Sequence, residues 1–143
     1  MHYTAVMGTT SRSFRIDAAT LGSLDDAARR EGVSANQLAA RLLEEGLRAQ
    51  AFPGLAFAKS RLGYRPILAG TRLAVWEVVA TLLSNTGDVE QTATDLDLTR
   101  DRVDVCARYY ATYKDEVDAY TGALEQAAAR ERALHERQRA IFS

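Results

Sequence analysis

The chain holds few residues that crosslink segments, break helices or ligate metals: one cysteine, two prolines and two histidines among 143 residues. A lone cysteine excludes a framework of internal disulfides and fits a reducing compartment, so we expect a cytoplasmic protein. The two histidines, His2 and His135, stand far apart in the sequence and lack the spacing of metal ligands. We therefore expect neither a metal site nor a bound cofactor.

Long apolar runs and a strong net charge are also missing. No stretch approaches about 18 consecutive apolar residues, so no membrane span is expected. The N-terminus lacks the basic and apolar regions of a signal peptide. The net charge of −1 excludes a uniformly basic nucleic-acid binder, so any nucleic-acid surface must be a local patch.

Catalytic patterns are absent as well. The sequence has no glycine-rich phosphate loop and no arrangement of nucleophile, base and acid. Cys106 falls beside the apolar stripe of an expected helix, where a cysteine is more often part of the core than a nucleophile. We expect that the protein is not an enzyme.

A short alternating stretch, residues 13–16, predicts a β-strand. Phe14 and Ile16 fall on one face by the two-residue period, and the opposite face carries Ser11, Ser13 and Arg15. A single strand with nothing local to pair with needs a partner, and the simplest partner is the same strand of a second copy. We therefore expect a homodimer whose two-stranded ribbon can enter the major groove of DNA.

Two helices should follow this strand. Asp17 fits the N-cap of the first helix, and Gly32 fits a left-handed residue just past its end. The Ser-x-x-Gln spacing of Ser34 and Gln37 predicts a capping box that begins a second helix, which should end near Gln50. Strand, helix, turn and helix together are too small to bury a core alone.

Residues 12–50 resemble the ribbon-helix-helix fold of the CopG, Arc and MetJ group. The resemblance is carried by Phe14-Arg15-Ile16, Leu21, Leu24, Ala28, Gly32-Val33-Ser34, Leu38 and Leu42. It implies that Ser11, Ser13 and Arg15 read base edges, and an arginine can contact guanine in a bidentate way. The amides around Ser34-Ala35-Asn36 would hold a phosphate. The alternative is a dimerisation ribbon that never meets DNA.

The next region, residues 52–118, should begin with two short strands. Residues 55–57 and 66–68 flank a basic loop, and the stretch 59–72 contains no acid. Its basic residues are Lys59, Arg61, Arg65 and Arg72. The loop could grip phosphates as a wing or could be an ordinary solvated loop, and the sequence leaves both open.

Three helices are expected after the strands. Residues 73–83 show the clearest helical period of the chain. Asp88 should cap a short helix and Thr99 a longer one whose apolar stripe continues through Tyr120, which is a helix-turn-helix pattern. Acids surround Arg100 and Arg102 at the start of the longer helix and would repel phosphates. A packing or protein-contact role is therefore expected there rather than reading of the major groove.

Residues 53–118 look like the family catalogued as domain-of-unknown-function family 433, found in VapB-type antitoxins. The matching pieces are Pro53-Gly54, Gly70-Thr71-Arg72, Val75-Trp76-Glu77-Val78, Gly87-Asp88-Val89-Glu90, Tyr109-Tyr110 and Asp115-Glu116-Val117-Asp118. The resemblance implies an antitoxin that binds a PIN-type ribonuclease toxin and represses the operon encoding both. The alternative is a stand-alone DNA-binding regulator without a toxin partner.

The last residues, 119–143, are rich in Ala, Arg, Glu and Gln and predict a helical tail that orders against a partner. Because PIN-type nucleases hold metal with clustered acids, arginines of this tail could neutralise such a cluster. The expected toxin-binding residues are Tyr113, Tyr120, Arg130, Arg132, Arg137, Arg139 and Phe142. An ordinary solvated helix end and packed tyrosines are the alternatives.

Together these patterns predict a mainly α protein with four parts. A flexible N-terminus (1–10) precedes a ribbon-helix-helix (11–50), and a helix-turn-helix-like antitoxin domain with a short β-hairpin (52–118) precedes a helical tail (119–143). The expected DNA-binding residues are Ser11, Ser13, Arg15, Ser34, Asn36, Lys59, Arg61 and Arg65.

Overall fold

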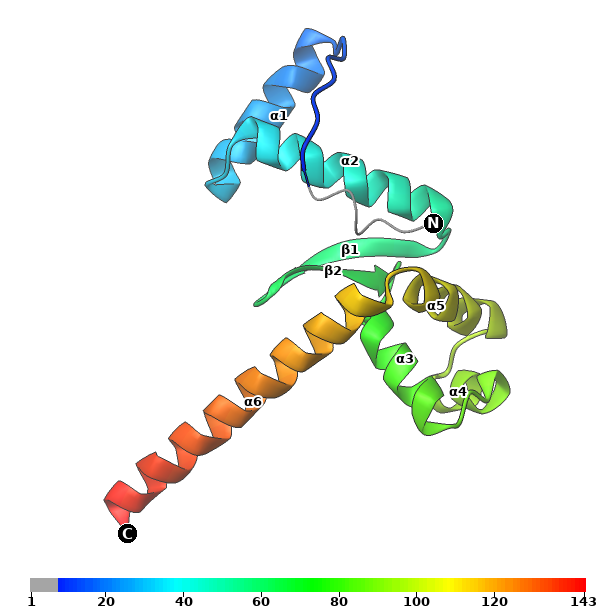
Figure 1. The fold of residues 1–143 in the computed structure, drawn as a ribbon, viewed down its shortest axis with the longest axis vertical. Helices are drawn as coiled ribbons and strands as arrows, with labels where there is room; N and C mark the ends of the chain where they lie inside the picture. The colour runs from blue at the N-terminus through cyan, green and yellow to red at the C-terminus, as the bar shows by residue number, and fades with distance from the viewer. Residues whose placement is uncertain (1–7) are drawn as a thin grey trace. The chain divides into compact units, whose positions relative to one another are not determined.

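A computed structural model of the chain describes residues 8–143 and is mainly helical, with one two-stranded antiparallel sheet (Figure 1). The elements are α1 (Ala18–Glu31), α2 (Ala35–Ala51), β1 (Leu55–Ser60), β2 (Gly63–Leu68), α3 (Val75–Ser84), α4 (Val89–Leu96), α5 (Arg100–Thr112) and α6 (Lys114–Phe142). The predicted mainly α class with a β-hairpin is confirmed. The predictions for His2 and for the first seven residues lie outside the described part of the chain.

The chain forms two compact units, Met1–Glu44 and Glu45–Ser143. The boundary falls inside α2, six residues before the predicted end of the first domain at residue 50. The reason is that the last turns of α2 pack with the second unit: Arg48 bonds to Tyr109, and Phe52 joins the buried core.

Local capping sets the helices of the first unit, as predicted. The Asp17 carboxylate accepts a hydrogen bond from the N–H of Thr20 at 3.3 Å and so caps α1. Gly32, with φ of 72°, takes the left-handed conformation that ends this helix and that glycine adopts without strain. Ser34 and Gln37 form the expected capping box at the start of α2.

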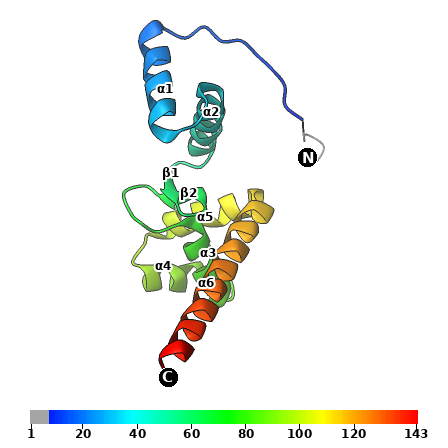
Figure 2. The ribbon, with the colours of Figure 1, turned by 90° about the vertical axis from the view of Figure 1, so that its left-hand side faces the viewer.

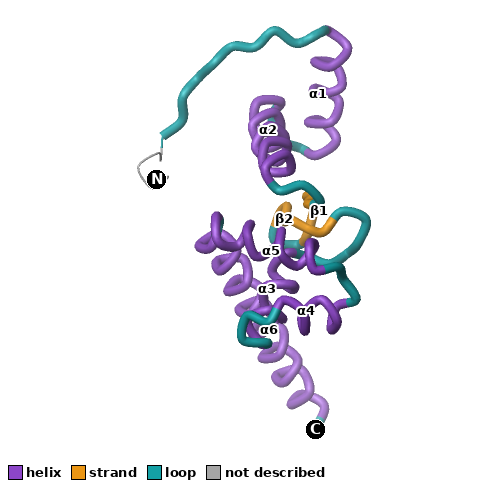
Figure 3. The backbone as a smooth tube through the Cα atoms, turned by 90° about the vertical axis from the view of Figure 1, so that its right-hand side faces the viewer, coloured by secondary structure: helices purple, strands orange, loops and turns teal. Residues whose placement is uncertain are grey.

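The predicted strand is not formed in the single chain. Residues 11–16 are loop, coloured teal before α1 in Figure 3. A strand is defined by hydrogen bonds to a neighbouring strand, and no other segment of the described chain pairs with these residues. The two-stranded ribbon therefore remains a prediction about a dimer.

The second unit is built around a single core. It gathers residues from the hairpin, from α3 and from α5, and β2 and α5 both pack on α3. The fully buried members with the largest side chains are Leu68, Val75, Val78, Val103, Cys106 and Tyr109. Cys106 is buried in this core, and burial raises the pKa of its thiol to about 12, which disfavours the reactive thiolate.

The β-hairpin is longer than predicted. Its register runs from Leu55 opposite Leu68 to Ser60 opposite Gly63, so the predicted basic loop is mostly strand. Only Arg61 and Leu62 form the turn, and Gly63 follows with φ of 106°. The sequence signal was weak because the polar strand ends look like loop residues.

The helix-turn-helix pattern of α4 and α5 is present. Asp88 caps α4 and Thr99 caps α5, as predicted. Gln91 N–H donates to the Asp88 carboxylate at 3.0 Å, and the Gln91 side chain donates to Asp95 at 2.7 Å. Asp97, with φ of 54°, ends α4 in the left-handed region and so makes the tight turn between the two helices.

The longer helix does not continue through Tyr120, contrary to prediction. It ends at Thr112, Tyr113 turns with φ of −120°, and α6 begins at Lys114. The predicted tail from residue 119 is therefore the continuation of a helix that begins five residues earlier. The first turns of α6 contact α3 and α5 and its later turns extend away from them (Figures 1 and 2). Across residues 8–143, none of the helices combines the length and the apolar composition that crossing a bilayer would need.

Candidate nucleic-acid and partner interfaces

The predicted base-reading residues Ser11, Ser13 and Arg15 lie on the exposed loop before α1. Phe14, between them, keeps 66% of its surface accessible, and Ile16 is exposed too. Adjacent side chains of a paired strand point to opposite faces. Pairing this loop would therefore place Ser13 and Arg15 on one face and allow Phe14 and Ile16 to be buried on the other.

The beginning of α2 is the second predicted phosphate-binding element. Gln37 N–H donates to Ser34 Oγ at 3.0 Å, and Ser34 N–H donates to Gln37 Oε1 at 3.1 Å. The capping box thus uses the Ser34 hydroxyl as an acceptor. Ala35 and Asn36 occupy the first positions of the helix, where backbone N–H groups have no intrahelical acceptor and the helix dipole favours an anion.

The hairpin does not present its basic residues as one patch. Arg65 lies opposite Ala58 and Lys59 lies opposite Tyr64 in the register. Since neighbouring residues point to opposite faces, Lys59 and Arg65 lie on opposite faces of the hairpin. Arg65 is half-buried, and its Nε is buried without a hydrogen-bond partner among the described residues. A wing made of Lys59, Arg61 and Arg65 acting together is therefore not supported.

The tip of the hairpin is tied to α6. Arg61 pairs with Glu131 at 3.3 Å, although both side chains are largely exposed and such a pair contributes little. The Tyr120 hydroxyl donates to Ser60 Oγ at 2.8 Å, and Ser60 Oγ donates to the Gly63 carbonyl at 2.6 Å. Tyr120, predicted to contact a toxin, therefore has a partner inside the chain.

The start of α5 is poorly suited to reading DNA. Arg100 pairs with Glu90 of α4, and Arg102 donates to the carbonyl of Ala69 at 2.5 Å. Both arginines are thus engaged within the unit. The exposed acids around them are Asp95, Asp97, Asp101 and Asp104. Negative charge here disfavours the approach of phosphates, which agrees with the expectation of a packing or protein-contact role.

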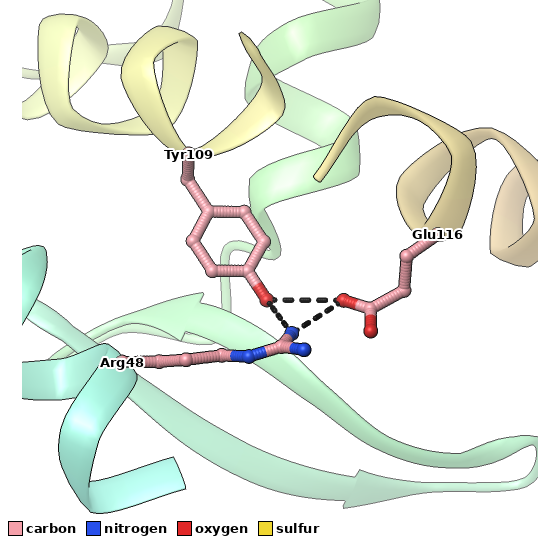
Figure 4. A network of polar contacts seen from close by, with 3 residues as sticks. All are labelled: Arg48, Tyr109 and Glu116. Atoms are coloured by element: carbon pink, nitrogen blue, oxygen red, sulfur yellow. Dashed lines mark hydrogen bonds and ion pairs between the residues drawn. The ribbon is translucent and has the colours of Figure 1, made fainter. Parts of the chain in front are cut away.

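A polar network that sequence reasoning missed joins the end of α2 to α5 and α6 (Figure 4). Arg48 Nη1 donates to Tyr109 Oη at 2.8 Å and to Glu116 Oε2 at 2.7 Å. The Tyr109 hydroxyl donates to the same Glu116 oxygen at 3.2 Å. The Arg48 guanidinium also lies 3.9 Å from the ring centroid of Tyr113. Tyr113, the other tyrosine predicted to contact a toxin, is therefore half-buried in this network.

The burial of its members determines where this network lies and keeps the Tyr109 hydroxyl protonated. The side chain of Arg48 is 15% exposed and that of Glu116 is 52% exposed, so the pair lies at the edge of the core rather than inside it. Burial, followed by the charge of Glu116, raises the pKa of Tyr109 above its usual value, so its hydroxyl stays protonated and donates. One feature of the sequence could have indicated that Arg48 lies next to the core. Arg48 stands four residues before the apolar Phe52, a spacing that places both side chains on the same helical face.

The last turns of α6 carry the remaining predicted toxin-binding residues. Arg130, Arg132, Arg137 and Arg139 are exposed, and Phe142 keeps 82% of its surface accessible. Leu134 and Ile141 are exposed on the same helix. This segment presents guanidinium groups and separate apolar side chains that are not covered by any other described part of the chain.

Within residues 8–143, no three His, Cys, Asp or Glu side chains gather closely enough to hold a metal ion. The chain matches no protein-family model, no curated protein and no solved structure.

Proposed function

We propose that the chain is an antitoxin that acts as a homodimer. In this proposal it binds and inhibits a PIN-type ribonuclease toxin, and it represses its own operon by binding operator DNA. The observation that carries the proposal is the N-terminal unit, where only Ala28 and Leu38 are buried among the described residues while Phe14, Leu42 and Leu43 are exposed. Units of about 40 residues usually need oligomerisation or crosslinks to fold stably.

A second copy would satisfy this unit in two ways. It would cover the exposed apolar side chains, and it would supply the partner strand for residues 13–16. The resulting ribbon would present Ser13 and Arg15 on its outer face, and an arginine there can donate two hydrogen bonds to guanine. The N–H groups of Ala35 and Asn36 would fix the ribbon against a phosphate. A two-fold protein of this kind requires a palindromic operator.

The toxin-binding part of the proposal is assigned to the last turns of α6. Tyr113 and Tyr120 have partners within the chain, so we assign toxin contact to the exposed arginines and to Phe142. Guanidinium groups pair with carboxylates in a bidentate geometry, which suits the acidic metal site of a PIN-type nuclease. Phe142 would add an apolar anchor at the end of the helix.

DNA binding is tested by fluorescence anisotropy of the full chain on its own upstream DNA and on scrambled DNA at several salt concentrations. We expect selective binding with a steep salt dependence. Arg15→Ala should weaken selective binding at least about fivefold, because a bidentate guanine contact contributes about 1–3 kcal/mol. The matched control is Arg108→Ala, which removes an exposed arginine of α5 paired with Asp104 and should leave binding unchanged. Equal, weak binding of the wild type to both DNAs would overturn the proposed repressor.

Inhibition is tested by co-expression with a PIN-type nuclease from a gene next to that of the chain. Residues 126–143 are the right segment to remove, because Val117 is buried and Tyr120 bonds to Ser60. We expect the truncated chain to bind DNA normally and to fail to protect cells. Protection by the truncated chain would show that the tail does not inhibit. Operator binding without any neighbouring nuclease would favour the stand-alone regulator.

A further inference from the structure

The sheet has two strands and therefore two edges, and the β2 edge is closed. Leu68 N–H donates to the carbonyl of Leu73 at 2.9 Å on the side away from β1. Ile67 forms a bridge with Ala74 on that same side. Pro66 has no N–H to offer, and a proline is one of the devices that protect the edge of a sheet.

The β1 edge differs, as the hydrogen-bonding alternation of the hairpin shows. Leu55 and Leu68 lie opposite each other in the hairpin, and neither N–H points at the other strand. Leu55 N–H donates to the carbonyl of Phe52 at 3.1 Å, and Leu68 N–H donates to the carbonyl of Leu73. In an antiparallel pair, hydrogen-bonded and non-hydrogen-bonded positions alternate. Phe57 and Lys59 are therefore also non-hydrogen-bonded positions, and their N–H and C=O groups point away from β2.

These groups form an open edge. In the described chain, no backbone hydrogen bond joins Phe57 or Lys59 to a segment outside the hairpin. β1 makes its close backbone contacts with β2, and it is β2 that packs on α3. The strand has no proline, and Lys59 is its only charged residue. An edge with these properties is a template for pairing with another strand.

We propose that β1 pairs antiparallel with β1 of a second copy of the chain, centred on Ala58, so that two hairpins form one four-stranded sheet. In this register Phe57 lies opposite Lys59 of the partner subunit, and Lys59 lies opposite Phe57 of the partner subunit. Each pair exchanges both of its N–H···O=C bonds. Neither an N–H nor a C=O of these two residues is then left unpaired.

The neighbouring registers satisfy fewer groups. Centring on Phe57 places Lys59 opposite Leu55 of the partner subunit, whose N–H already donates to Phe52. Centring on Lys59 places two ammonium groups opposite each other and pairs Phe57 with the turn residue Arg61. Like charges directly opposite one another are destabilising. Self-pairing is therefore favoured at one register only.

Side chains agree with the register centred on Ala58. Lys59 would lie beside the Phe57 ring across the strands, at about 5.5 Å between Cα atoms, which suits a cation–π contact. Ala58 would face Ala58 of the partner subunit at a non-hydrogen-bonded position, where Cα atoms approach to about 4.5 Å. Two alanine side chains are small enough for this approach. This pairing involves no DNA or toxin contact and is independent of the proposed function.

The test is disulfide crosslinking of full-length Ala58→Cys in a glutathione redox buffer at low protein concentration. The expected Cα separation lies within the range that a disulfide spans, so we expect a covalent dimer on a non-reducing gel. Ala56→Cys is the matched control on the same face of β1. Its own counterpart would be about 13 Å away at roughly 3.3 Å per residue, so it should stay monomeric on the gel. The native Cys106 is buried, and the wild type controls for it.

A second pair of variants tests the backbone directly. Lys59→Pro, added to Ala58→Cys, removes the outward N–H while leaving the bonds to β2 intact, and should abolish the crosslink. Lys59→Ala removes the charge but keeps the N–H, and should retain the crosslink. Absence of the Ala58→Cys dimer, or equal crosslinking of Ala56→Cys, would overturn the proposed sheet. Operator binding measured on the same samples separates this failure from a failure of the proposed function.

Discussion

The two units of the chain bury their apolar residues to very different extents. The C-terminal unit encloses side chains from the hairpin, α3 and α5 in one core, and Leu68, Val78 and Val103 are fully buried. The N-terminal unit has comparable apolar residues, but Phe14 and Leu43 keep 66% and 54% of their surface accessible. Hydrophobic periodicity is present in both units, and only one of them completes its core within the single chain.

The difference shows which unit gains less from burial within the single chain. Apolar burial contributes about 25 cal/mol for each Å² removed from water, and the N-terminal unit obtains little of this contribution alone. The single tryptophan, Trp76, lies in α3 of the C-terminal unit. Its fluorescence therefore reports on that unit specifically, and the comparison can be tested by following each unit separately.

The largest effect is expected from Leu68→Ala. This buried residue of β2 packs in the core, and truncating a buried leucine costs about 2–5 kcal/mol. Urea unfolding followed by Trp76 fluorescence should show this loss at every protein concentration. Leu83→Ala, at an exposed position of α3, is the control and should change stability by less than about 0.5 kcal/mol.

Leu43→Ala should have a smaller effect of a different kind. The residue is exposed in the single chain, so the Trp76 transition should not move. If a second copy covers it, the dimer dissociation constant should rise at least about tenfold, which corresponds to about 1.4 kcal/mol. Analytical ultracentrifugation measures this constant. Leu134→Ala, another exposed leucine on α6, should leave it unchanged, and an unchanged constant for Leu43→Ala would contradict a dimer through this unit.

Tyr109→Phe should destabilise the C-terminal unit modestly. It removes the hydroxyl that joins Arg48 to Glu116, and a net hydrogen bond contributes about 0.5–1.5 kcal/mol. The Arg48–Glu116 ion pair remains, so the network is weakened rather than lost. Tyr110→Phe removes an exposed hydroxyl that bonds to Asp118 at 2.8 Å, and urea unfolding of this control should match the wild type. An equal loss of unfolding free energy in both variants would show that the Arg48–Tyr109–Glu116 network adds no more stability than an exposed hydrogen bond.

The smallest effect is a pH dependence at Asp95. Hydrogen bonds from Asn85 and Gln91 hold the pKa of this carboxyl below its ordinary value of 3.8 in the folded chain. Its contribution to stability is therefore fully present above the unfolded pKa and is lost as the pH falls through the lower, folded pKa. Urea midpoints of the wild type and Asp95→Asn should converge as the pH falls through the folded-state pKa of Asp95, which lies below 3.8. Asp25→Asn, in α1, should leave the Trp76 midpoint unchanged at each pH.

Local capping signals in the sequence predicted the helix starts correctly, although the break between α5 and α6 was missed. Asp17, Gly32, Ser34 and Thr99 act on backbone groups within a few residues of themselves, so their roles can be inferred from spacing alone. The hairpin was predicted too short, because polar residues at strand ends resemble loop residues. Its full extent depends on the cross-strand register, which no local pattern reveals.

Long-range contacts could not be predicted. Tyr113 was expected to continue a helical stripe, and instead it ends a helix and packs against Arg48, 65 residues earlier. The basic residues Lys59 and Arg65 were grouped because they are close in sequence, whereas the strand register places them on opposite faces. Predicting these contacts requires knowing which helices and strands pack together. The local patterns of a single sequence do not give that information.

The anchoring of α2 has a consequence for the order in which the chain is made. The partners of Arg48, Tyr109 and Glu116, follow it by 61 and 68 residues. At a synthesis rate of about 5–20 residues per second, roughly 3–14 s pass between the addition of Arg48 and that of Glu116. During that interval the end of α2 has only its own helix propensity and its neighbours in sequence. The N-terminal unit is therefore synthesised before the segments that hold the end of α2, and that end becomes fixed only when α6 begins to be made.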